Sequence, residues 1–61
     1  MYYKEFFYLC EDGNDNWIAE FKNFEEAKTF AEQNSCVKEI FKYATDGEDI
    51  ECLECCWTRE S

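Results

Sequence analysis

The 61-residue chain contains no histidine and no proline, and it has only two glycines. Without histidine, the chain lacks the side chain that exchanges protons near neutral pH, and a serine or cysteine nucleophile lacks its usual general base. The sequence also contains no glycine-rich phosphate-binding loop. A chain this short leaves no room for a substrate cleft. We therefore predict a protein that is not an enzyme and that needs no cofactor.

Cationic residues are scarce as well: six lysines and arginines stand against fifteen aspartates and glutamates, for a formal net charge of −9 at pH 7. Nucleic-acid binding draws much of its affinity from cationic side chains on phosphates, so direct contact with nucleic acid is disfavoured. An anionic membrane surface is disfavoured for the same reason. The charge favours a basic protein surface as the partner. Alternatively, it serves only to keep an aromatic-rich domain soluble.

No apolar run reaches the roughly 20 residues that a membrane-spanning helix needs. Residues 1–5 lack the basic segment and the cleavage site of a secretory signal. We therefore expect a cytoplasmic protein. In that compartment the five cysteines would be reduced.

The two glycines, Gly13 and Gly47, mark two loops between segments with strand and helix patterns. Residues 2–10 are apolar on both faces, which predicts a central strand. Alternating apolar residues over 17–22 predict the strand that follows it. These two strands are expected to form a hairpin around the first loop.

A helix is predicted to begin at Phe24. Asn23 has the side chain of an N-cap, and Glu26, three residues later, completes a capping box. The apolar residues that follow recur at spacings of three and four, which predicts one apolar stripe on the helix. That stripe consists of Phe24, Ala27, Phe30 and Ala31. Asn34 is the predicted C-terminal cap.

Two more strands are predicted over residues 36–44 and 49–58. The Asp-Gly pair at 46–47 between them is typical of a two-residue type I′ turn, because both central positions of that turn need positive φ angles. This turn predicts a register in which Ile40 lies opposite Leu53.

The predicted fold is a single α+β domain over residues 1–61, with the element order ββαββ. We prefer the strand order 2-1-3-4 over 1-2-3-4, because it makes every neighbouring pair antiparallel and places the apolar first strand inside the sheet. One short helix packs on one face and cannot cover four strands. The open face is expected to expose Ile40, Leu53 and Trp57.

This topology is expected to bring four cysteines to one end of the sheet: Cys10, Cys36, Cys55 and Cys56. Four thiolates can hold a structural zinc ion, and a disulfide such as Cys36–Cys55 is another alternative. However, only Cys52 and Cys55 have the two-residue gap typical of zinc ligands, and adjacent residues of a regular strand point to opposite faces. Free buried thiols are therefore the preferred interpretation.

Acidic residues gather in three places along the chain. These are the first loop (Glu11, Asp12 and Asp15), the helix start (Glu25 and Glu26) and the second hairpin (Asp46, Glu48, Asp49 and Glu51). The helix direction predicts that the helix start and the second hairpin form one anionic end, with carboxylates spaced like a stretch of phosphate backbone. Charged turns and helix starts, however, are usually only solvated and capped.

The sequence therefore predicts an acidic protein-binding module that occupies a basic groove of a partner. The partner could be a nucleic-acid-binding protein, and small inhibitors encoded by phages and mobile elements act in this way. The predicted contacts are the carboxylates of the helix start and second hairpin, Glu25, Glu26, Asp46, Glu48, Asp49 and Glu51, with Trp17 and Trp57 as aromatic anchors. One alternative is an interaction protein that forms homodimers through its open sheet face. Another is a small zinc-stabilised domain.

Overall fold

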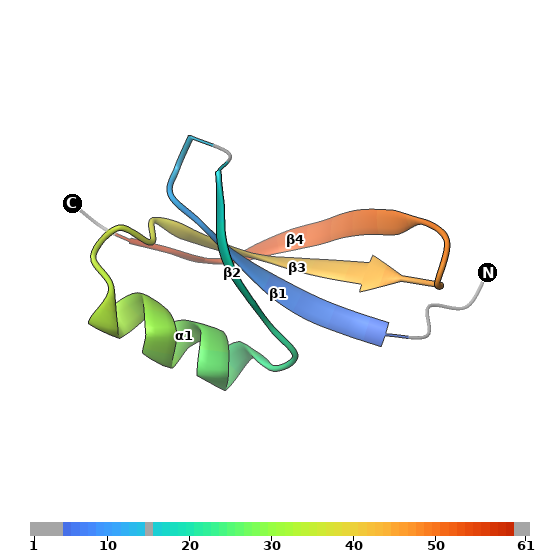
Figure 1. Cartoon of the computed structure of the whole chain (residues 1–61), viewed down its shortest axis with the longest axis horizontal. Coiled ribbons are helices and arrows are strands. Elements are labelled where there is room, and N and C mark those ends of the chain that lie inside the picture. The colour runs from blue at the N-terminus through green and yellow to red at the C-terminus, as the bar shows by residue number, and fades with distance from the viewer. Residues whose placement is uncertain (1–4, 15, 60–61) are drawn as a thin grey trace.

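The computed structural model describes residues 5–14 and 16–59. Its elements are β1 (Glu5–Glu11), β2 (Trp17–Phe21), α1 (Phe24–Gln33), β3 (Glu39–Thr45) and β4 (Ile50–Thr58). The strands form one sheet in the order β2-β1-β3-β4, and every neighbouring pair is antiparallel (Figure 1). The predicted ββαββ fold, with its strand order and single helix on the sheet, is confirmed. Within the described residues, no helix has the length and apolar character needed to cross a membrane.

The helix begins where the sequence predicts because Asn23 caps it. The Asn23 Oδ1 accepts a hydrogen bond from the backbone N–H of Glu26 at 2.9 Å, and the Asn23 Nδ2 donates to Glu26 Oε1 at 3.1 Å. At the other end, the side chain of Asn34 donates to the carbonyl oxygen of Phe30 at 2.8 Å. Both predicted caps are therefore present, and they satisfy backbone groups that the helix itself leaves without partners.

The hydrophobic core lies between α1 and one face of the sheet. Its fully buried members are Cys10, Ala27, Ala31, Val37 and Ile40, with half-buried aromatic residues packed around them. The predicted helix stripe is confirmed: Ala27 and Ala31 have no exposed area, and Phe24 and Phe30 pack beside them. Packing against this core stabilises a helix that is too short to be stable alone.

The turn of the second hairpin differs from the prediction. It is a four-residue loop, Asp46–Asp49, closed by Thr45 opposite Ile50. The Asp46 Oδ1 accepts hydrogen bonds from the backbone N–H groups of Glu48 at 2.9 Å and Asp49 at 2.8 Å. An aspartate that binds the amides following it stabilises this wider loop, and Gly47 still supplies the positive φ angle, 101°.

Two bulges in β4 shift its register against β3 further. Each adds one residue to β4, so that Ile40 lies opposite Trp57 and not opposite Leu53. The predicted apolar set of the open face is therefore wrong. Ile40 is fully buried and Trp57 packs against the core, whereas Leu53 is 39% exposed.

Candidate functional site

The second hairpin presents its acidic loop at one end of the long axis (Figure 1). Glu48 and Asp49 are exposed at this loop, and Glu51 is exposed on β4 opposite Ala44. The hydrogen bonds from the backbone of Asp49 and then of Glu48 lower the pKa of the Asp46 carboxyl. Asp46 is thus a charged structural cap, while Glu48 and Asp49 are accessible to a partner.

The helix start forms a second acidic place. Glu25 and Glu26 are exposed and line an open depression between α1 and β2, together with Phe21 and Phe30. The two rings have centroids 5.4 Å apart. Carboxylates beside aromatic rings are suited to receive a cationic side chain.

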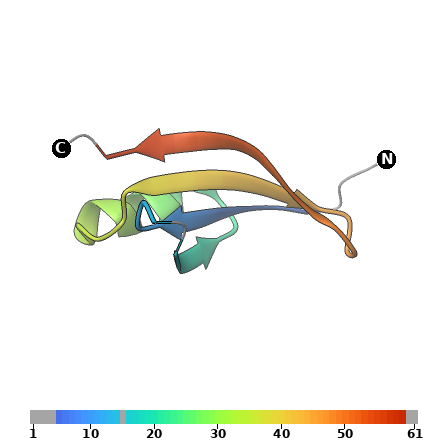
Figure 2. The same ribbon diagram turned by 90° about the horizontal axis from the view of Figure 1, so that it is seen from above.

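The two acidic places do not form one contiguous end. Both views show the helix starting near the middle of the long axis, whereas the second hairpin loop lies at its end (Figures 1 and 2). The hairpin of β3 and β4 extends beyond α1, which packs mainly on β1 and β2. The predicted joining of the helix start to the second hairpin is therefore wrong, because the strands of that hairpin carry its loop well beyond the start of α1.

The acidic residues of the first loop are mainly structural. The Asp12 carboxylate accepts hydrogen bonds from the backbone N–H of Asn14 at 2.8 Å and from the Asn16 Nδ2 at 3.0 Å. The bond from the Asn16 side chain, followed by that from the Asn14 backbone, lowers the pKa of Asp12. Glu11 belongs to β1 and is only 7% exposed. Asp15 lies outside the described residues.

Acid is expected to weaken the fold through Asp12 and Asp46. Because their pKa values are lowered in the folded chain, the unfolded chain takes up protons first as the pH falls. Their stabilisation is complete above about pH 5 and is lost below about pH 4, as the pH passes through the folded pKa. Urea denaturation of the native chain and of Asp46→Asn should show a stability difference that shrinks on acidification. A difference that is independent of pH would contradict this role.

The two predicted aromatic anchors lie in different environments. Trp17 is 65% exposed, and its cross-strand partner is Glu11 on β1. Trp57 is half-buried against the core, with the guanidinium carbon of Arg59 at 5.2 Å from its ring centroid. Trp17 is therefore the more accessible of the two to a partner.

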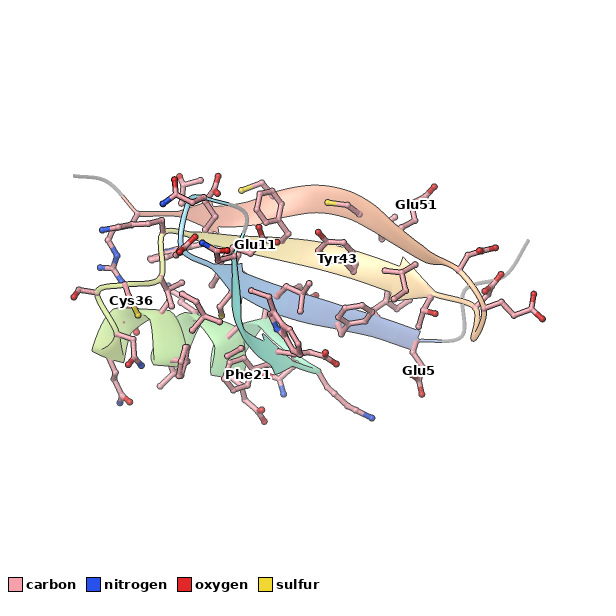
Figure 3. All side chains as sticks on the ribbon, turned by 45° about the horizontal axis from the view of Figure 1, so that its top comes forward. Glu5, Glu11, Phe21, Cys36, Tyr43 and Glu51 are labelled. Carbon is pink, nitrogen blue, oxygen red and sulfur yellow. The ribbon has the colours of Figure 1, made fainter. Side chains whose placement is uncertain are left out.

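The four cysteines predicted to meet do not gather. Cys10 is fully buried beneath α1, where its Sγ donates to the carbonyl oxygen of Ala27 at 3.8 Å, whereas Cys55 pairs with Phe41 on the opposite face. Cys36 is exposed beside the end of α1 (Figure 3). All five cysteines are free, and the described residues include no group of three or more cysteine, aspartate or glutamate side chains placed to hold a metal ion. The bulges of β4 and the inward position of Cys10 explain the difference.

The face of the sheet opposite α1 carries a set of apolar residues other than the predicted Ile40, Leu53 and Trp57. Cross-strand partners point to the same side of a sheet. The core pair of Cys10 and Ile40 points toward α1, so the pairs that alternate with it along the strands point to the opposite side. We call it the open face; its central apolar and thiol members are Phe7, Leu9, Phe41, Tyr43, Cys52 and Cys55, and Trp17 and Ile50 lie at its opposite ends. The sequence contained a signal for it, because β1 is apolar at every second residue on both sides.

A bulge in β4 completes the open face. Cys52 and Cys55 are three residues apart, so a regular strand would point them to opposite faces. Because Leu53 is the extra residue, Cys52 pairs with Tyr43 and Cys55 with Phe41, and both thiols share the open face. Burial raises the pKa of Tyr43, and the neighbouring Cys52 and Glu11 raise it further.

The chain matches no protein-family model, no curated protein and no solved structure at a significant level.

Proposed function

We propose that this chain is a non-enzymatic acidic module that binds a basic surface of another protein. The observation that carries the proposal is the net charge of −9 combined with exposed carboxylates at two separate places, the helix start and the second hairpin loop. Such a charge attracts cationic partners and speeds their encounter.

The contact residues of this proposal are Glu25, Glu26, Glu48, Asp49 and Glu51, with Asp46 holding the loop that presents Glu48 and Asp49. The depression lined by Phe21 and Phe30 at the helix start favours a lysine or arginine of the partner. In the narrower form of the proposal, the loop carboxylates imitate phosphates in the groove of a nucleic-acid-binding protein. Because the helix start lies apart from that loop, the imitation rests on the loop alone.

A capture experiment tests the proposal. The immobilised native chain is compared with a variant in which Glu25, Glu26, Asp46, Glu48 and Asp49 are changed to their amides. We expect the native chain to retain basic proteins from a lysate at about 0.05 M salt. We expect about tenfold less retention by the amide variant, and by the native chain at about 0.5 M salt, because salt screens exposed charges. Glu32→Gln, on the exposed side of α1, is the control and should retain the same proteins as the native chain.

Two results would overturn the proposal: equal retention by the native chain and the amide variant, or retention that is insensitive to salt. The homodimer alternative predicts the opposite dependence on salt, and light scattering measures it. A dimer held by apolar contacts between two chains of charge −9 should become stronger as salt screens their repulsion.

A further inference from the structure

The open face has the dimensions of a site for one helix. Its apolar residues lie on three adjacent strands, β1, β3 and β4, which span about 10 Å at ~4.8 Å per strand spacing. A helix with its side chains is about 10 Å across. On the other side of the same sheet, α1 packs mainly on β1 and β2, so one face of this sheet already holds a helix (Figure 2).

The centre of the open face is ordered by aromatic packing. The rings of Phe7 and Tyr43 are stacked, with centroids 5.6 Å apart and an interplanar angle of 11°. These side chains are half-buried, as are Leu9 and Phe41. Figure 3 shows Tyr43 on β3 in the middle of the sheet. A partner would therefore meet a preformed apolar surface, which reduces the cost of ordering side chains on binding.

The charges on the open face are of one sign. The register places the carboxylates of Glu5, Glu20 and Glu39 around the apolar residues. Lys42, the one cationic residue in the described strands, lies on the α1 side, where its Nζ is 4.9 Å from the centroid of the Phe6 ring. An apolar centre with a purely acidic margin is complementary to apolar residues flanked by lysine or arginine.

We propose that the open face docks an amphipathic helix of another protein, whose apolar stripe is flanked by lysine and arginine. This inference rests on the proposed function and names its main contact surface. The apolar stripe would cover Phe7, Leu9, Phe41 and Tyr43, while its cations would reach Glu20 and Glu39. A second copy of this chain is a poor occupant, because its open face would bring carboxylates against carboxylates.

Amide resonances of the full chain, measured by NMR during titration with a synthetic helix, locate the surface. The probe is an amphipathic peptide of about 18 residues with leucines on one stripe and lysines beside them; the control peptide has glutamates in place of the lysines. We expect the lysine peptide to shift the resonances of Phe7, Leu9, Phe41 and Tyr43 and the glutamate peptide to shift none of them. No shifts up to about 1 mM peptide, or shifts confined to the helix start or hairpin loop, would overturn the inference.

Two matched charge reversals separate this inference from the proposed function. Glu20→Lys alters the margin of the open face and Glu32→Lys alters the outer side of α1; both residues are exposed, and both changes raise the net charge by two. We expect Glu20→Lys to weaken binding of the lysine peptide about fivefold to tenfold at low salt, and Glu32→Lys to weaken it less than about twofold. If both variants weaken peptide binding equally, the peptide is attracted by the overall acidic charge and not by the open face. The proposed function would then stand, and the open-face site would fail. If the native chain does not bind the peptide and also retains no basic protein, both proposals fail.

Discussion

Replacing Ile40 with alanine is expected to lower the free energy of unfolding by about 2–5 kcal/mol. Ile40 is fully buried in the core beneath α1, so the shorter side chain leaves a cavity as well as losing apolar contact. A 61-residue domain has a total stability of about 3–9 kcal/mol, at roughly 0.05–0.15 kcal/mol per residue. The loss is therefore a large fraction of the total stability. Urea denaturation followed by far-UV circular dichroism measures the loss.

Ile50 provides the matched control for this substitution. It has the same side chain but is 65% exposed at the start of β4, opposite Thr45. Ile50→Ala should change the stability by no more than about 0.5 kcal/mol, as is usual for surface positions. If both substitutions cost the same, the assignment of the core to the α1 side of the sheet is wrong.

Removing the Arg59 side chain is expected to cost about 2–3 kcal/mol. The Arg59 Nε donates to the carbonyl oxygen of Val37 at 2.8 Å, and its Nη2 donates to the carbonyl oxygens of Ala31 and Asn34. The guanidinium thus joins the chain after β4 to the last turn of α1 and to the segment that follows it. In Arg59→Ala, carbonyl oxygens at the helix C-terminus lose a charged donor, which also complemented the helix dipole.

The Arg59 prediction is checked by thermal and urea denaturation beside two controls. Lys28→Ala removes the same charge from an exposed position in the middle of α1 and should change the stability by about 0.5 kcal/mol or less. Arg59→Lys keeps the charge but has a single ammonium group in place of the planar fork, so it should recover only part of the loss. The bridging role would be refuted if Arg59→Ala were as stable as Lys28→Ala.

Arg59 also illustrates which site and stability features could not be found in the sequence. It is the one arginine of the chain, but its carbonyl acceptors lie 22 to 28 residues earlier. No local pattern links residues that far apart. The open face was predicted with the wrong members for a related reason: the register of β3 against β4 decides which residues lie on it, and that register depends on the hairpin loop and two bulges.

The sequence alone determined the elements and their order, because those depend on local physics. Capping by Asn23, the three-and-four spacing of the helix stripe and the doubly apolar first strand were sufficient to predict α1, its buried side and the 2-1-3-4 sheet. The charge of −9 is likewise the basis of the proposal that the partner is basic. Only the tertiary structure decided which side chains share a surface. The Asp46 loop and the β4 bulges move side chains between faces, and the length of the second hairpin separates its carboxylates from the helix start. Register and strand length are set by contacts summed over the whole sheet, and a one-residue shift reverses the face of every side chain beyond it.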